Sequence, residues 1–315
     1  CRLMHPPNGI QATSLVRTFG QVRAVGGISL EIPLGTVTGI LGPNGSGKST
    51  TLRMLCGLVR PDSGTANIAG VRLSGDGTAV RKVSTFAPGE IALYGEMRGG
   101  EHLAWLLRGR PPGALAKSRA ITQKLGLPPD KKVHAYSHGM KRQLLFAAAM
   151  GPDVPVRILD EPTEGLDPAK RQEVLDLIAS DADEGRLILL SSHHLSEVQA
   201  VCGRLIFFHA GKIIADESPA DLATRARRTV RIGYETPAEA KLACAAMERE
   251  FGTDERLILS LAVNALEVST TLAIDDPRTF LAAFGALEAP RPRMLAIGSL
   301  SLTDLYRTVY GVSGL

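Results

Sequence analysis

A glycine-rich loop at residues 42–50, with the sequence GPNGSGKST, limits the folds open to this chain more than any other feature. The apolar run VTGIL at 37–41 comes directly before it and predicts a buried strand, while the residues from about Ser49 to Leu58 predict a helix. A strand, a glycine loop and a helix in this order build a phosphate-binding loop, because backbone N–H groups then converge on phosphate oxygens. A glycine turn without a ligand is the alternative, and the flanking strand and helix disfavour it.

The loop supplies a charge and a hydroxyl group as well as backbone donors. Lys48 can place its ammonium group near the β and γ phosphates of a nucleotide, and the Ser49 hydroxyl can ligate Mg²⁺. The predicted nucleotide-binding residues are Gly42, Pro43, Asn44, Gly45, Ser46, Gly47, Lys48, Ser49 and Thr50.

An acidic pair ends a second apolar run. The residues at 156–160 predict a strand, and Asp160 and Glu161 stand at its carboxyl end, the edge at which parallel α/β sheets bind ligands. A solvated acidic turn is the alternative reading. Arg157 interrupts this run, so we expect its charged end to reach solvent and the strand to be less buried than usual.

Further segments indicate a parallel α/β core. Strands predicted at 156–160, 186–191 and 204–208 alternate with helices, which favours a parallel α/β core, and a separate strand is predicted at 28–33. The stretch at 99–150 has apolar residues at helical spacing, interrupted by the turn-rich RGRPPG at 108–113. It predicts a mostly helical insert.

The tail from about Arg228 has a different pattern. Strands are predicted at 229–234, 257–261, 266–272 and 294–297, with helices at 237–250 and 277–285. The order β, α, β, β, α, β is that of a ferredoxin-like α+β unit. We therefore predict two domains, at 1–225 and 226–315. The arginines at the junction, Arg225, Arg227, Arg228 and Arg231, fit a solvated linker better than a nucleic-acid patch.

Composition excludes several classes of protein. With 44% hydrophobic and 22% charged residues the chain is globular, and a net charge of +4 that is spread along the sequence gives little reason to expect a nucleic-acid partner. Four cysteines without a CxxC pair suit free thiols in the cytosol. No apolar run approaches the roughly 20 residues of a membrane helix, and the N-terminus is unlike a signal peptide. The start at Cys1 suggests that the sequence is not the full translation product.

Three motifs together resemble the ATP-binding cassette (ABC) ATPases. They are GPNGSGKST at 42–50, the signature segment YSHGMKRQ at 136–143 and ILDEPTEGLDP at 158–168, and they occur in the family's order within a stretch of about 12–222. The details of YSHGMKRQ, a PGE at 88–90 and the tail SLTDLYRTVYG look like the ATPase subunits of daunorubicin-type drug exporters. The resemblance implies a phosphate-loop cassette with a mixed sheet core and a helical subdomain at about 95–150.

The resemblance also implies a catalytic set. Asp160 would support Mg²⁺ together with Ser49, and Glu161 would orient or deprotonate the attacking water. His193 would donate to the γ phosphate, alongside Lys48, while the neighbouring His194 would cap a helix or face solvent.

Other residues match the family's binding positions. Phe19 would stack on adenine and Val25 would extend that surface, although packing in the core is the stronger alternative for both. Asp167 matches the loop between subunits. In the family the signature segment contacts the nucleotide held by a second copy, which implicates Ser137, His138, Gly139 and Met140.

Two positions depart from the family pattern. Gly89 stands where the family has a glutamine that links Mg²⁺ to the membrane subunit, and we hypothesise that Glu90 or a water takes over. The alternative is that the contact is lost. His138 replaces a glycine of the signature, and the sequence does not decide whether it touches nucleotide.

The resemblance implies an ATPase with Mg²⁺ as cofactor and ATP as substrate. It would form a head-to-tail dimer with a second copy of itself and dock beneath a separate transmembrane permease, peripheral on the cytoplasmic face of the cell membrane, with no nucleic acid bound. The alternatives are an ABC ATPase of DNA repair or translation and a non-catalytic nucleotide sensor. Only about ninety residues separate Lys48 from Ser137, which leaves no room for the long coiled coils of the repair proteins.

Overall fold

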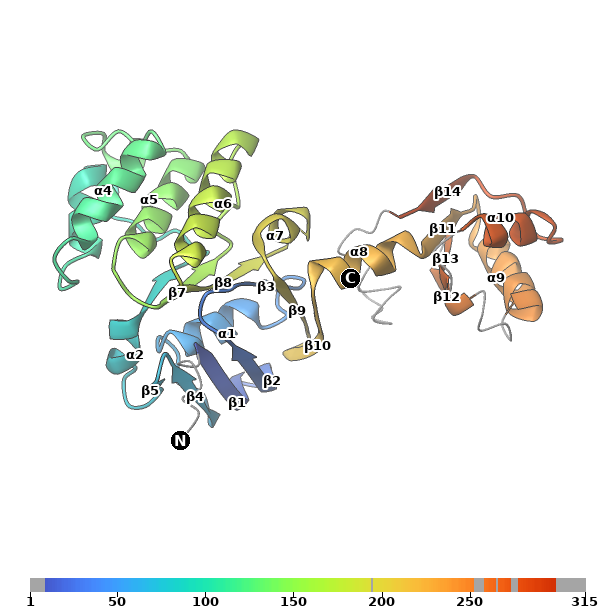
Figure 1. Cartoon of the computed structure of the whole chain (residues 1–315), viewed down its shortest axis with the longest axis horizontal. Coiled ribbons are helices and arrows are strands. Elements are labelled where there is room, and N and C mark those ends of the chain that lie inside the picture. The colour runs from blue at the N-terminus through green and yellow to red at the C-terminus, as the bar shows by residue number, and fades with distance from the viewer. Residues whose placement is uncertain (1–8, 194, 252–257, 265, 273–276, 299–315) are drawn as a thin grey trace. The chain divides into compact units, whose positions relative to one another are not determined.

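The computed structural model describes residues 9–193, 195–251, 258–264, 266–272 and 277–298 (Figure 1). The chain divides into two compact units, Cys1–Asp216 and Glu217–Leu315. The boundary predicted at 225/226 lies within helix α8 (Pro219–Arg227).

A six-stranded sheet forms the centre of the first unit, in the order β10-β9-β3-β8-β7-β6. Strand β3 pairs in parallel with β8 and β9, and β7 pairs in parallel with β8 and β6. Strands β3, β7 and β8 are buried along their whole length, as in a sheet covered on both faces. The parallel α/β core is therefore confirmed. The strands are β3 (Val37–Leu41), β6 (Ser84–Ala87), β7 (Val156–Asp160), β8 (Leu187–Ser192), β9 (Arg204–His209) and β10 (Lys212–Glu217).

A second, antiparallel sheet makes the core of this unit mixed. Its order is β2-β1-β4-β5, formed by β1 (Ile10–Phe19), β2 (Val22–Ile32), β4 (Ser63–Ile68) and β5 (Val71–Arg72). Helix α1 (Lys48–Leu55) contributes Leu52 to one apolar cluster with Leu15 of β1, Ile40 of β3 and Phe208 of β9, all fully buried. This shared core fixes the glycine loop between β3 and α1.

Helix α2 directly precedes β6, whereas α3 to α5 lie between β6 and β7 in the sequence, and Figure 1 shows α4 and α5 side by side. The helical insert is thus confirmed, and RGRPPG lies between α3 and α4. The bounds are α2 (Thr78–Val83), α3 (Gly99–Leu106), α4 (Ala114–Lys124), a short 3₁₀ helix (Val133–Ala135) and α5 (His138–Met150). Two more helices, α6 (Pro168–Asp183) and α7 (Leu195–Val201), alternate with the later strands.

Arg157 corrects one expectation. Its side chain has no exposed surface and every residue of β7 is buried, so the prediction of a solvent-reaching arginine in a less buried strand is wrong. Burial is tolerated because Asp181 of α6 accepts a hydrogen bond from Arg157 Nε over 2.9 Å, which pairs the charge inside the protein.

The second unit has the predicted order β, α, β, β, α, β after α8. Its sheet runs β12-β13-β11-β14, with antiparallel pairing of β11 with β13 and β14 and of β12 with β13. Val230 and Ile232 of β11 pack with Met247 of α9 and Phe280 of α10 in a separate apolar core. The elements are β11 (Thr229–Gly233), α9 (Pro237–Phe251), β12 (Ile258–Asn264), β13 (Glu267–Leu272), α10 (Arg278–Gly285) and β14 (Met294–Ile297).

Among the residues that the structure describes, no helix has both the length and the apolar character needed to cross a bilayer.

Candidate functional site

The glycine loop is held by close backbone contacts. A Cβ on Gly42 would lie 2.5 Å from the carbonyl oxygen of Phe208, and one on Gly47 would lie 2.4 Å from that of Ala24, so neither position tolerates a side chain. Gly47 also has a φ of 100°, which favours glycine. The predicted residues from Gly42 to Gly47 therefore form the loop between β3 and α1, and Lys48, Ser49 and Thr50 are the first residues of α1.

Lys48 is the first residue of α1 and is almost fully buried. Its ammonium group donates to the carbonyl oxygens of Gly42 and Pro43 over 2.7 and 3.1 Å. Burial lowers the pKa of Lys48, and the carboxylates of Glu161 and Asp160 oppose that shift. The side chain thus lies inside the loop with two carboxylates close enough to affect its charge.

Asp160 lies at the carboxyl end of β7, beside the loop. Its Oδ1 accepts hydrogen bonds from Ser49 Oγ over 3.1 Å and from Ser191 Oγ over 2.6 Å. The hydroxyl and carboxylate oxygens of Ser49 and Asp160 suit Mg²⁺, which proteins hold through one or two such ligands plus phosphate oxygens and water. Within the described residues no group of three or more His, Cys, Asp and Glu side chains lies close enough together to hold a metal ion.

Ser191 is a site residue that the sequence reasoning missed. It is fully buried at the end of β8, where its Oγ also accepts the backbone N–H of Glu161 over 3.0 Å. Its hydroxyl therefore bridges the side chain of Asp160 and the backbone of Glu161. The signal available in the sequence was a pair of serines ending the apolar run RLILL, directly before His193.

Glu161 and His193 meet in the folded chain. Glu161 Oε2 lies 3.0 Å from His193 Nδ1, with the two side chains 14% and 37% exposed. Glu161 has a φ of 50°, a left-handed conformation that is uncommon outside glycine and costs about 1–3 kcal/mol. The pairing of β7 with β8 holds this turn, and it presents the carboxylate beside the histidine.

The two residues predicted to contact adenine differ sharply. Phe19 ends β1 and is 47% exposed, and the guanidinium carbon of Arg17 lies 4.6 Å from its ring centroid. Its ring can therefore offer a surface to a base. Val25 has no exposed surface and belongs to the apolar core, so the prediction that it extends the adenine surface is wrong.

Gly89 lies close to the carboxylate of Asp160. A Cβ at this position would lie 3.2 Å from Asp160 Oδ2, so the segment that carries the family's glutamine does reach the predicted metal site. The carboxylate of Glu90 is 86% exposed and pairs instead with Arg53 of α1 over 3.4 Å. A role for Glu90 toward Mg²⁺ stays a prediction, and it would require this pair to separate.

The signature segment forms the start of α5. Ser137 is the N-cap, and its Oγ accepts the backbone N–H of Met140 over 3.2 Å. His138 lies against Gly165, since a Cβ there would be 2.8 Å from His138 Nδ1, and a Cβ on Gly139 would be 3.0 Å from the carbonyl oxygen of Gly165. The signature therefore packs on the loop that follows Glu161.

That loop ends at Asp167, which caps α6 by accepting the backbone N–H of Lys170 over 3.0 Å. A second missed residue ties the loop to α5: Arg142, 3% exposed, donates to Glu164 over 2.8 Å. In the described part of the chain, the side chains of Ser137 and His138 form no hydrogen bond or ion pair with Lys48, Ser49 or Asp160. The predicted residues thus gather in two groups, one around Lys48 and one around Ser137.

Comparisons with known proteins identify the family to which the chain is similar. A family model described as ABC transporter matches residues 25–164. The chain is 34% identical over 312 residues to the daunorubicin/doxorubicin resistance ATP-binding protein DrrA of Streptomyces peucetius, covering 95% of this chain and 87% of the relative. It is 33% identical over 221 residues to the linearmycin resistance ATP-binding protein LnrL of Bacillus subtilis (strain 168), covering 69% and 71%.

Solved structures give the same fold. The structure of an ATP binding subunit of an ABC transporter superposes with a TM-score of 0.62 at 25% identity, covering 68% of this chain and 91% of that one. The match to the Streptomyces protein reaches further along the chain and extends into the second unit.

Proposed function

The chain belongs to the ABC transporter family of ATP-binding proteins, and from this membership we propose that it is the ATP-hydrolysing subunit that drives export of a drug or other small molecule through a separate membrane permease. Two relatives named for antibiotic resistance, to daunorubicin/doxorubicin and to linearmycin, support the exporter assignment. The observation that carries the proposal is the convergence of Lys48, Asp160, Glu161 and His193 at one edge of the sheet.

Hydrolysis needs charge compensation and an oriented water. Lys48 places its ammonium group within the glycine loop, where it would neutralise charge on the β and γ phosphates. When bound by Ser49 and Asp160, Mg²⁺ supplies further positive charge to the phosphate oxygens. Glu161 would orient the attacking water and accept its proton, because a carboxylate in hydrogen-bond reach can act as general base.

His193 would position that carboxylate and sense the γ phosphate. Its Nδ1 lies 3.0 Å from Glu161 Oε2, and an imidazole N–H is a suitable donor to a phosphate oxygen. The pair therefore connects the presence of the γ phosphate to the orientation of the base.

The second group of residues would serve a second copy of the chain. Ser137 begins α5, and its hydroxyl and the N–H groups of this helix are suited to a phosphate oxygen. We propose a head-to-tail dimer in which Ser137 and Gly139 of each copy contact the γ phosphate held by Lys48 of the other. Closure on ATP and reopening after hydrolysis would transmit work through α3 to α5 to a permease at the cytoplasmic face of the membrane.

Mixing two inactive variants tests the shared site. Lys48→Ala removes the phosphate-binding amine and Ser137→Ala removes the signature hydroxyl, so each homodimer should lose most of its ATPase activity. In a mixed dimer, one site combines the intact Lys48 of one copy with the intact Ser137 of the other. Random pairing should therefore restore about a quarter of the wild-type rate.

The matched control mixes Lys48→Ala with Glu161→Gln. Both changes lie on the same half of the site, so every mixed site keeps one defect and activity should stay at the level of the separate variants. Recovery in the control mixture, or none in the test mixture, would contradict the head-to-tail arrangement.

Transport is tested in cells that express this chain with the membrane protein of its own gene neighbourhood. Efflux of a fluorescent anthracycline should depend on the chain and should stop with Glu161→Gln. Efflux that is unchanged by this variant would refute the exporter assignment while leaving the ATPase assignment intact.

A further inference from the structure

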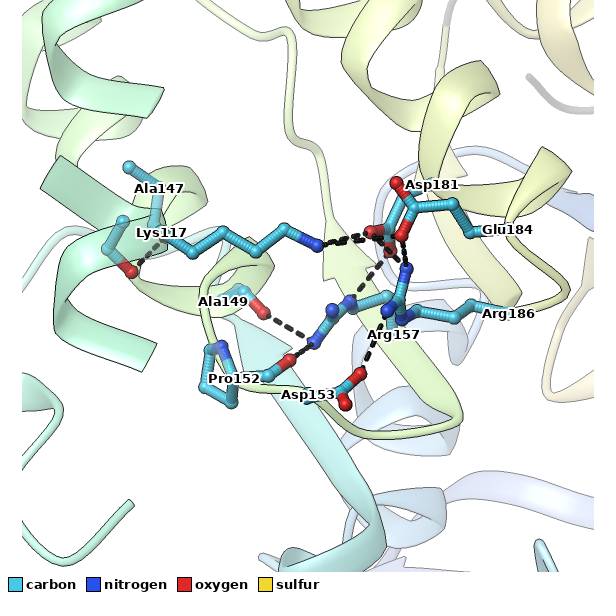
Figure 2. Close-up of polar contacts among 10 residues, drawn as sticks. Lys117, Ala147, Ala149, Pro152, Asp153, Arg157, Asp181, Glu184 and Arg186 are labelled. Atoms are coloured by element: carbon cyan, nitrogen blue, oxygen red, sulfur yellow. Dashed lines mark hydrogen bonds and ion pairs between the residues drawn. The ribbon is translucent and has the colours of Figure 1, made fainter. Parts of the chain in front are cut away.

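Arg157 is the largest fully buried side chain in the described structure, and it lies three residues before Asp160 on the same strand. Nothing in the nucleotide chemistry uses it. A guanidinium group is unfavourable inside a protein unless it is paired and hydrogen-bonded, so the partners of Arg157 show what the position does. Figure 2 draws the residues around it.

Arg157 joins two parts of the first unit. Its Nε donates to Asp181 Oδ2 of α6 over 2.9 Å, and its Nη1 donates to the carbonyl oxygens of Ala149 and Pro152 over 3.1 and 2.5 Å. Ala149 is in the last turn of α5, and Pro152 lies just beyond its end. The guanidinium therefore anchors the end of α5 to the core at β7 and α6.

Asp181 collects a second contact from the helical insert. Its Oδ1 accepts hydrogen bonds from Lys117 of α4 over 3.1 Å and from Arg186, which precedes β8, over 3.0 Å. Burial alone would raise the pKa of Asp181, but Arg157 and Lys117 hold it below the usual value. The carboxylate thus stays ionised at neutral pH, and of the three cations that it binds, Lys117 comes from the insert while Arg157 and Arg186 come from the core.

Helices α4 and α5, which both contact this cluster, also pack closely against each other beside it. Ser118, next to Lys117, donates to the carbonyl oxygen of Ala147 over 2.8 Å. A Cβ on Gly151 would lie 1.8 Å from Ser118 Oγ, so glycine is required for this approach. The first part of α4 and the last turn of α5 are therefore packed together, and Arg157 and Asp181 attach both of them to the core.

Helix α5 connects this anchored end to the signature segment. The helix has 13 residues, so it is about 20 Å long. Arg157 of β7 binds its last turn, and Ser137 is its N-cap at the opposite end. A tilt of about 10° at the anchored end would displace the other end by about 3 Å. Misplacement of about 1 Å can cost a reaction about 100-fold, so the orientation of α5 decides whether Ser137 reaches a phosphate on another copy.

We propose that Arg157, Asp181 and Lys117 form a charged clamp that sets the orientation of the helical insert on the core and thereby positions Ser137 for the partner's nucleotide. The proposal rests on the head-to-tail site of the proposed function. The three are positioning residues, since none of them contacts the nucleotide-binding side chains. The competing explanation is that the cluster only stabilises the fold.

Two cations on the same oxygen of Asp181 provide a matched pair of variants. Lys117→Met removes the ion pair between α4 and Asp181. Arg186→Met removes a cation that lies outside the insert and also pairs with Asp153 and Glu184. Arg157→Met removes the central group, and Arg157→Lys keeps the charge but replaces the planar guanidinium, whose bonds come from two nitrogens, by a single ammonium nitrogen. Lys117 is 38% exposed, so its variant should fold even if Arg157→Met does not.

The first measurement is a distance between spin labels at Ala120→Cys on α4 and Thr65→Cys on β4, in a chain with Cys1→Ser. The described native cysteines, Cys56, Cys202 and Cys244, are buried and will not compete for label. We expect Lys117→Met and Arg157→Met to shift or broaden the distance distribution, Arg157→Lys to do so less, and Arg186→Met to leave it unchanged. This measurement does not require a dimer.

The second measurement compares binding at a copy's own site with binding across the interface. In a Glu161→Gln background, fluorescent ATP analogue should bind the monomer with a Kd within about twofold of the parent in every variant. The protein concentration for half-maximal dimerisation in ATP should rise about tenfold for Arg157→Met and several-fold for Lys117→Met, but not for Arg186→Met.

The outcomes separate the clamp from the proposed function. Equal effects of Lys117→Met and Arg186→Met on label distance and dimerisation, or a fall in Tm alone, would overturn the clamp. If the parent itself fails to dimerise in ATP, the head-to-tail site is wrong, and the label distances still decide whether Arg157 and Lys117 set the orientation of the insert.

Discussion

The two ends of strand β7 both carry charged side chains, but these differ in whether they remain accessible or are fully buried and paired. At its carboxyl end, Asp160 and Glu161 lie beside Lys48 and His193, with the side chains of Glu161 and His193 still partly exposed. Near its amino end, Arg157 and Asp181 are 0% and 4% exposed and bind each other directly. The charged groups at the carboxyl end remain accessible to a ligand, whereas the charged groups near the amino end bind each other and connect β7 to α6.

The backbone differs in the same sense. Glu161 has a left-handed φ of 50°, while Arg157 lies in regular strand paired with β6 and β8. At Glu161 an uncommon backbone conformation directs a carboxylate toward the site, whereas at Arg157 regular strand pairing places the side chain against its partners. The following changes test this contrast.

The largest effect should come from Glu161→Gln at the open end. Loss of the general base should lower the ATPase rate about 1,000-fold, while ATP binding is retained. Steady-state phosphate release measures the rate. Glu184→Gln, at the closed end, is the control and should change the rate less than twofold. A Glu161 variant that hydrolyses ATP as fast as the parent would remove this residue from the mechanism.

Asp181→Asn should damage stability instead. Three cations, from Arg157, Lys117 and Arg186, would then surround a neutral amide, at a cost of about 3 kcal/mol in the free energy of unfolding at pH 7. Urea unfolding measures it.

The same variant gives a pH test with a definite sign. The folded-state pKa of Asp181 lies below its unfolded value of about 3.9, so its contribution is fully present above that pH and is lost as pH falls through the folded pKa. The difference between parent and Asp181→Asn should therefore shrink below about pH 4. A difference that is constant down to pH 2 would show that the carboxylate charge is not what stabilises the cluster.

His193→Ala should have an intermediate effect. Without the imidazole, Glu161 loses its described side-chain partner and the γ phosphate loses a donor, so the rate should fall about 10- to 100-fold. His134→Ala is a suitable control, because His134 is exposed and pairs only with Glu96 among the described residues. An unchanged rate would indicate that the contact with Glu161 has no role in turnover.

Phe19→Ala should give the smallest change. Loss of stacking on adenine would cost about 1 kcal/mol, which raises KM for ATP about fivefold and leaves kcat and Tm nearly unchanged. Val22→Ala is the control, since Val22 is even more exposed and lies just past the same turn. Equal KM values for both variants would mean that the exposed ring is not used.

The sequence by itself determined the parts of this protein that depend on local pattern. The loop at 42–50 requires its glycines wherever it occurs, the apolar runs around it form strands, and the tail alternates as its elements do in the structure. Asp160 and Glu161 could be placed because they directly follow one such strand. The ABC family assignment followed from motifs that are contiguous in the chain.

Only the tertiary structure decided which of these side chains face a ligand and which face each other. Val25 and Phe19 are six residues apart with opposite exposures, because the pairing of β1 with β2 turns one into the core and leaves the other at the end of the sheet. Ser191, Arg142 and Arg157 find partners 22 to 31 residues away, through contacts that no local pattern encodes. From the sequence, the side chain of an arginine in an apolar strand can either reach solvent or be buried. Arg157 is buried because Asp181, which lies beside it in the folded chain, pairs its charge where water cannot reach.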